Sequence, residues 1–182
     1  DKKTLDSPPF TRYLNFPGIM ERMGISDAPG RKFFIKIDAE KHEYGDFAYD
    51  HETSILNRFD VFVPLHCGPL SFILSTKMCA ILERAKGRDY YDITELVKLT
   101  RPNIDYIRNR MEFGRLKQVY SGPESYITTA LAALNTVDWK DKAREISKFL
   151  FDPSESEKVL WFKEYATEER IGAWLRTDAN SV

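Results

Sequence analysis

Hydrophobic and polar positions along the chain change their period near residue 69. Residues 32–40 alternate between the two faces of a predicted strand, which places Phe33, Ile35, Ile37 and Ala39 together. Residues 59–65 form a second apolar strand, and the polar stretch 42–57 before it is a predicted loop with a short strand possible at its end. Apolar residues within 11–23 instead fall near helical spacing, with a helix beginning at Pro17.

The chain from residue 70 onward has the spacing of helices. They are predicted over 70–86, 89–100, 104–120, 125–135, 138–150 and 154–175, and Gly87 lies in the usual position just past the first one. Strands followed by helices indicate an α+β fold. We expect a partial sheet in residues 1–69 and a helical C-terminal domain in residues 70–182.

Composition limits the classes of partner. The 182 residues contain 27 Lys and Arg against 28 Asp and Glu, so no global field draws the chain to nucleic acid or to an anionic membrane. Any polyanion site must therefore be a local cluster. Two cysteines, no signal peptide and no apolar run of membrane-spanning length indicate a cytoplasmic protein without membrane contact.

Lys77 is the first candidate for chemistry. It falls inside the apolar stripe of the 70–86 helix, where a lysine must snorkel, pair or face a cavity. A snorkelling lysine and a functional one are about equally compatible with that pattern. Arg84, Lys86 and Arg88 follow at the end of the same helix and make this segment locally basic.

Asp89 and Asp92 begin the next predicted helix, on the stripe that Leu96 and Val97 continue. Each aspartate has a structural alternative, because Asp89 or Asp92 could cap the helix and the arginines could simply pair with them. Taken together, the cations and carboxylates converge on one helix-turn-helix corner. Such a corner suits a nucleoside triphosphate, since lysine and arginine bind phosphate oxygens.

Asp38 is the candidate on the strand. It shares a face with Glu40 and Lys36, and carboxylates on strands hold Mg²⁺ in metal-dependent phosphoryl transfer. A solvent-facing edge strand would show the same pattern. The three histidines lack zinc spacing, and no phosphate-binding glycine loop or serine-hydrolase motif occurs.

Residues 77–92 match K-x-x-A-x-x-x-R-x-K-x-R-D-x-x-D at every fixed position, and the chain there resembles the nucleotidyl transferase AbiEii/AbiGii toxin family. The Lys36-Ile37-Asp38 strand is similar to the K-I-[DE] strand of that family. The resemblance covers about residues 33–99. It implies a DNA polymerase β-like nucleotidyltransferase sheet followed by a helical C-terminal bundle.

The resemblance also implies roles. The enzymes transfer a nucleoside monophosphate from an NTP to an acceptor such as tRNA or protein, with Mg²⁺, and many are toxins with a cognate antitoxin or act in phage defence. Asp38 would be a metal carboxylate or a base near the acceptor hydroxyl. Lys77 would hold the triphosphate with Arg84, Lys86 and Arg88 in support, and Asp89 or Asp92 would be the essential acid that orients the lysine or the acceptor.

One family motif has no counterpart here. The family begins with a Gly-Gly or Gly-Ser turn and a D-x-D metal pair, and nothing upstream of Lys32 matches it. We expect this motif on a segment absent from the chain, since Asp1 is not a natural start. Three hypotheses follow: an enzyme competent only with that segment, a nucleotide- or RNA-binding module without chemistry, and a structural helical domain.

Overall fold

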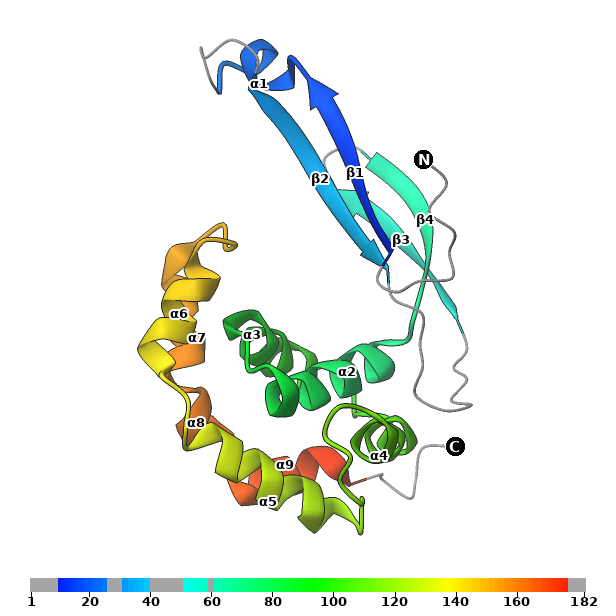
Figure 1. Cartoon of the computed structure of the whole chain (residues 1–182), viewed down its shortest axis with the longest axis vertical. Helices are drawn as coiled ribbons and strands as arrows, with labels where there is room; N and C mark the ends of the chain where they lie inside the picture. The colour runs from blue at the N-terminus through cyan, green and yellow to red at the C-terminus, as the bar shows by residue number, and fades with distance from the viewer. Residues whose placement is uncertain (1–9, 26–30, 40–50, 59–60, 177–182) are drawn as a thin grey trace. The chain divides into compact units, whose positions relative to one another are not determined.

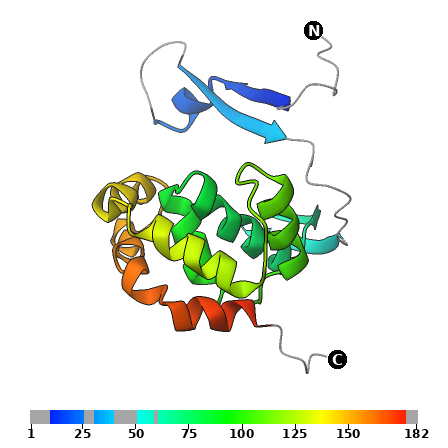
Figure 2. The same ribbon diagram turned by 60° about the horizontal axis from the view of Figure 1, so that its bottom comes forward.

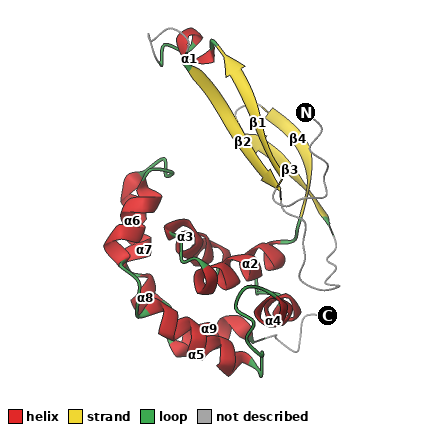
Figure 3. Ribbon diagram, in the orientation of Figure 1, coloured by secondary structure: helices red, strands yellow, loops and turns green. Residues whose placement is uncertain are grey.

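The structure of the chain is a computed structural model that describes residues 10–25, 31–39, 51–58 and 61–176. Its contacts divide the chain into two compact units, residues 1–43 and 44–182, and each is described by itself. The described residues form two antiparallel two-stranded sheets and a larger set of helices (Figure 1 and Figure 3). The predicted α+β class is therefore confirmed.

The first unit is a β-hairpin, in which β1 (Phe10–Pro17) pairs with β2 (Lys32–Ala39) and the short helix α1 (Ile19–Arg22) follows β1. The predicted 32–40 strand is confirmed. The helical interpretation of 11–23 is wrong for β1, because its apolar residues also alternate and pair across to β2. Leu14 lies opposite Ile35 and Phe16 opposite Phe33.

The second unit opens with another hairpin, formed by β3 (Glu52–Arg58) and β4 (Val61–Cys67). The predicted apolar strand is found here, displaced by two residues from 59–65 to 61–67. The strand suggested at the end of the 42–57 loop is β3. Residues 42–50 and 59–60 lie outside the described residues.

The remaining helices begin directly after this hairpin and stay within the second unit. Five come at or near their predicted places, but the single helix predicted over 154–175 is broken into short pieces. Thr167 accepts a hydrogen bond from the backbone N–H of Arg170 and so starts a new helix in the middle of that range. The bounds are α2 Leu70–Glu83, α3 Gly87–Leu96, α4 Ile104–Phe113, α5 Pro123–Leu134, α6 Trp139–Ser147, η1 Pro153–Ser156, α7 Glu157–Leu160, α8 Phe162–Tyr165 and α9 Glu168–Leu175.

Helix α2 is central to this bundle, because it packs against α3, α4 and α5, while α6 and α7 cover α3 (Figure 2). The Tyr90 ring of α3 lies at 5.0 Å from the rings of both Trp139 and Phe162. The Tyr126 hydroxyl of α5 donates to the Met78 carbonyl of α2 at 2.9 Å. Helices α2 and α3 are thus held from several sides. No helix among the described residues is long and apolar enough to cross a bilayer.

Gly87 does not end α2, as its position suggested. The helix stops at Glu83, Ala85 takes the left-handed conformation (φ 46°), and Gly87 is the first residue of α3. A Cβ on Gly87 would lie 2.3 Å from the backbone oxygen of Lys142 in α6. The glycine is therefore required by the close contact between α3 and α6.

The hydroxyl of Tyr90 leads to a stability prediction. It is buried and has no hydrogen-bond partner among the described residues, so its desolvation is uncompensated. We expect Tyr90→Phe to raise the free energy of unfolding by about 1 kcal/mol, measured by urea denaturation. A loss of stability in this variant would show instead that the hydroxyl has a partner, such as a buried water.

Candidate functional site

The candidate site is the corner where α2 ends and α3 begins, and we call the group Lys77, Arg84, Lys86, Arg88, Asp89 and Asp92 the α2–α3 corner. Lys77 comes from the middle of α2 and the two aspartates from α3. Arg84, Lys86 and Arg88 lie in and beside the turn between the helices. The corner forms because α2 and α3 pack together and the left-handed Ala85 reverses the chain between them.

Asp89 contacts two cations of the α2–α3 corner. Its side chain is fully buried, and it accepts two hydrogen bonds from Arg84, at 3.0 Å from Nε and 2.9 Å from Nη2. Lys77 Nζ lies 3.4 Å from the same carboxylate and 2.6 Å from Asp92 Oδ2. The hydrogen bonds to Asp89 raise the pKa of the Arg84 guanidinium above its ordinary value. One buried carboxylate therefore holds two cations side by side.

Both cations keep donors for a ligand. Side-chain exposure is 21% for Lys77 and 42% for Arg84, whereas Asp89 reaches no solvent. A guanidinium has five N–H groups, and two of those of Arg84 point to Asp89, which leaves three. Asp89 cannot touch a ligand at this depth. It orients Lys77 and Arg84 instead.

The capping alternative for the aspartates is wrong. Lys86 occupies the N-cap position of α3, and no side chain caps the helix there by hydrogen bonding. Instead Glu145 of α6 accepts the backbone N–H of Gly87 at 3.2 Å. Burial raises the pKa of Glu145, but this hydrogen bond and the nearby Lys142 and Lys86 outweigh it and lower the pKa overall.

Arg88 and Lys86 extend the positive charge outward. Both are exposed, and neither makes an ion pair within the part of the chain that the structure describes. The expected pairing of Arg88 with the aspartates does not occur. Arg84 alone among the three turn cations is tied to a carboxylate, so the other two are available to an anion.

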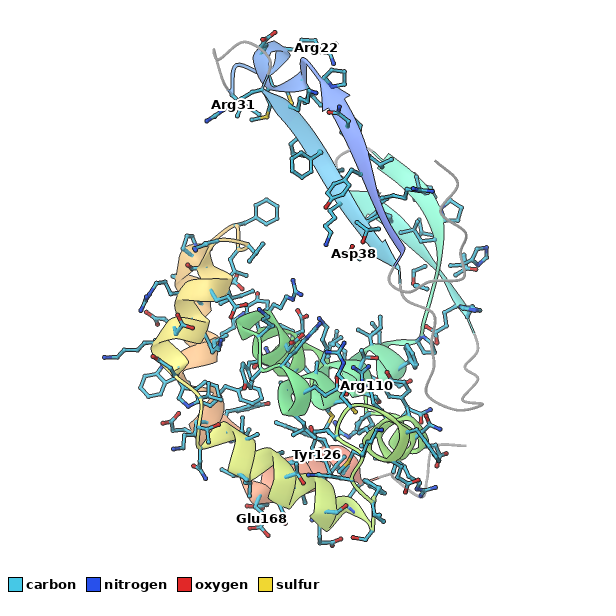
Figure 4. The ribbon with its side chains drawn as sticks, viewed as in Figure 1. Arg22, Arg31, Asp38, Arg110, Tyr126 and Glu168 are labelled. Carbon is cyan, nitrogen blue, oxygen red and sulfur yellow. The ribbon has the colours of Figure 1, made fainter. Side chains whose placement is uncertain are left out.

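Asp38 belongs to the first unit, on β2 of the hairpin (Figure 4). Its Oδ2 lies 2.8 Å from Lys36 Nζ and its Oδ1 accepts from the Thr11 hydroxyl at 2.7 Å. The hydrogen bonds from Lys36 and Thr11 lower the pKa of this exposed carboxyl. Asp38 shares a face with Lys36, as predicted; Glu40 lies outside the described residues.

Other chemistry has little support. No group of three or more metal-ligating side chains occurs within residues 10–25, 31–39, 51–58 and 61–176. Burial raises the pKa of the Cys79 thiol to about 12, so this cysteine is not a nucleophile at neutral pH.

Sequence reasoning missed a second ion pair beside the corner, between Glu83 of α2 and Arg110 of α4. The signal was present, because Arg110 falls on the helix stripe of Tyr106, Ile107 and Met111 in the way that Lys77 interrupts the stripe of α2. A cation within an apolar stripe indicates a buried partner. Nothing in the sequence pattern identified that partner as Glu83.

Comparison with known proteins gives one match. The family described as nucleotidyl transferase AbiEii toxin of a type IV toxin–antitoxin system matches residues 13–164, which include most of the first hairpin, all of the second and the whole α2–α3 corner. No curated protein and no solved structure matches the chain. The match extends over most of the sequence and agrees with the resemblance of residues 77–92. The chain therefore belongs to the AbiEii nucleotidyl transferase toxin family.

Proposed function

We propose that the α2–α3 corner binds the triphosphate of an NTP and that the full-length protein transfers the nucleoside monophosphate to an acceptor. The observation that carries this proposal is the pair of cations, Lys77 and Arg84, held by the fully buried Asp89. Membership of a nucleotidyltransferase family gives the reaction class. The geometry of the corner supports the triphosphate as the part of the NTP that binds there.

Preorganisation is the physical reason. A triphosphate carries its charge on several oxygens, and cations that are already oriented bind them without a further loss of side-chain entropy. Arg84 presents a planar set of donors and Lys77 a compact charge. Lys86 and Arg88 are exposed on the same turn and add positive charge that no ion pair with a carboxylate among the described residues neutralises. We assign Lys77 and Arg84 to the triphosphate and Lys86 and Arg88 to its support.

An acceptor hydroxyl oxygen attacks the α-phosphorus, the bond from that phosphorus to the bridging oxygen breaks, and pyrophosphate leaves. The hydroxyl proton passes to a base, and negative charge grows on the departing pyrophosphate. Cations that hold the β- and γ-phosphates stabilise this growing charge. Lys77 and Arg84 would do so, and Asp92, bound to Lys77, would orient it.

Magnesium enters the proposal from the family alone. Asp38 is the one candidate carboxylate that we assign to it, with the role of base near the acceptor as the alternative. The described residues do not form a Mg²⁺ site, because Asp38 is already bound to Lys36 and Thr11 and no cluster of ligands surrounds it.

The biological setting follows from the family. Toxins of such systems are paired with antitoxins, so we expect a cognate antitoxin as partner, with tRNA or a protein as acceptor. NTPs and both acceptors are present in the cytoplasm, where we place the reaction. A binding module without chemistry is the alternative, in which the corner holds a nucleotide or an RNA end.

The test is NTP binding followed by transfer. We expect the dissociation constant for an NTP to rise about tenfold in Lys77→Ala, the equivalent of ~1.4 kcal/mol, as measured by isothermal titration calorimetry. Inorganic triphosphate should compete with the NTP and a nucleoside should not. The matched control is Lys98→Ala, which removes a lysine of the same unit that pairs with Glu95 away from the corner.

The outcomes separate the hypotheses. Equal affinity of Lys77→Ala and the unaltered chain would remove the corner from nucleotide binding. Binding without label transfer from any α-labelled NTP by the full-length protein would favour the binding module. Neither binding nor transfer would leave the corner as an ion-pair cluster of a structural helical domain.

A further inference from the structure

The end of α2 is fixed by a second, more deeply buried ion pair. Arg110 of α4 donates to Glu83 through Nη2 at 2.6 Å and through Nε at 3.0 Å. The two side chains are only 13% and 3% exposed. A two-point guanidinium–carboxylate contact at this burial sets the relative direction of both groups, not only their distance.

Arg110 is itself held in place. Its Nη1 donates to the Tyr106 hydroxyl, one turn earlier on the same helix, at 2.8 Å. Burial lowers the pKa of Arg110, but the hydrogen bonds to Glu83 and Tyr106 outweigh it and raise the pKa. Figure 4 shows Arg110 between α4 and α2. The guanidinium is thus an anchored cation that ties the last residue of α2 to α4.

Glu83 connects the anchored Arg110 to the α2–α3 corner. It is the last residue of α2, and the next residue is Arg84, whose backbone N–H still bonds to the Ala80 carbonyl at 2.9 Å. The chain then turns through the left-handed Ala85. Fixing Glu83 therefore fixes the starting point and direction from which the Arg84 side chain reaches Asp89.

Charge joins the two ion pairs as well. The pKa of the Arg84 guanidinium depends most on its hydrogen bonds to Asp89, which raise it, and next on burial, which lowers it. The charge of Arg110 also lowers this pKa, and the charge of Glu83 raises it. The guanidinium groups of Arg84 and Arg110 are thus close enough to repel. Glu83 lies on the same helix end and offsets this repulsion.

We propose that Arg110, acting through Glu83, is a positioning residue that aims Arg84 at the triphosphate site. This inference rests on the proposed nucleotide binding at the corner. Arg110 makes no contact with a ligand in this role. Its contribution is the geometry of Arg84, so variants of Arg110 should change that geometry even where no nucleotide is present.

The experiment uses a charge-neutral pair of changes, Glu83→Leu with Arg110→Met, and the single change Arg110→Lys. Replacing both partners of a buried ion pair by apolar residues of similar size typically preserves stability, so the double variant separates folding from positioning. The first readout is the nitrogen-15 NMR signal of the Arg84 Nε–H, assigned by its absence in Arg84→Lys. The second is the dissociation constant for an NTP. The control for general destabilisation is Ile171→Val in the core of α9.

We expect the Arg84 Nε–H signal to shift and to exchange faster with solvent in both variants, but not in Ile171→Val. The NTP dissociation constant should rise about three- to tenfold, with Arg110→Lys the smaller change because it keeps the charge. An Arg84 signal unchanged in the double variant would overturn the positioning role, whether or not the chain binds nucleotide. A shifted signal in a chain that binds no NTP would keep the geometric role and reject the proposed function.

Discussion

Substituting Asp89 by asparagine should slow nucleotide transfer by the full-length protein by about a hundredfold or more, the cost of a displaced catalytic group. The NTP dissociation constant should change by less than about fivefold. The variant should also lose about 2 kcal/mol of stability, because it weakens charge-assisted hydrogen bonds to a fully buried group. Transfer is measured with labelled NTP, binding by calorimetry and stability by urea denaturation.

The difference between transfer and binding has a physical cause. Asparagine removes a negative charge behind Lys77 and Arg84, so the field at the corner becomes more positive and favours a polyanion. The same change releases Arg84 from its fixed orientation and leaves Lys77 with its contact to Asp92, which weakens binding of the phosphates. These effects oppose each other in affinity. The two effects do not cancel in the rate of transfer, because only oriented cations stabilise the charge of the departing pyrophosphate.

The matched control is Asp105→Asn, which removes an exposed carboxylate of α4 that pairs with Arg108. It changes the net charge by the same amount and should leave the transfer rate as it is. Equal losses of transfer in the two variants would mean that net charge, not the placement of Asp89, governs activity. A fully active Asp89→Asn would contradict the orienting role.

Gly87→Ala should lower the free energy of unfolding by about 3 kcal/mol. The new Cβ would meet the backbone oxygen of Lys142 at 2.3 Å, and backbone cannot rotate away as a side chain can. Helices α3 and α6 would separate, and the hydrogen bond from Gly87 to Glu145 would be lost with them. Thermal or urea unfolding measures the effect.

The matched control lies two residues earlier. Ala85 has a φ of 46°, a conformation that glycine adopts without strain. Ala85→Gly should therefore be neutral or stabilising by up to about 1 kcal/mol. If Gly87→Ala proved as stable as the unaltered chain, the close contact of α3 with α6 would be wrong. If Ala85→Gly were strongly destabilising, the left-handed conformation of the turn at Ala85 would be wrong.

The corner was predictable in its members but not in its geometry. Lys77 interrupts an apolar stripe and the aspartates lie on another, so spacing alone brought them to one corner. Spacing could not say which cation each carboxylate holds. Asp89 is fully buried and Asp92 is more than a third exposed, although both contact Lys77 of α2. Burial depends on how the helices pack together, which spacing along the chain does not give.

The errors in secondary structure have a similar origin. In β1, Leu14 and Phe16 fit both a helix and a strand, and the pairing with β2 decided between them. Gly87 had the sequence position of a helix end, but its lack of a side chain serves a contact with Lys142, 55 residues away in sequence. Local pattern identifies that a residue is unusual. It does not identify the distant neighbour that requires it.

The most direct measurement of the central claim is binding of an NTP to the chain with and without the cations of the corner. The comparison is the unaltered chain against Lys77→Ala with Arg84→Ala, with Lys98→Ala as control. We predict saturable binding that inorganic triphosphate displaces, retained in the control and weakened about a hundredfold in the double variant, on the basis of about tenfold for each cation. Binding of equal strength in the unaltered chain and the double variant would contradict the account.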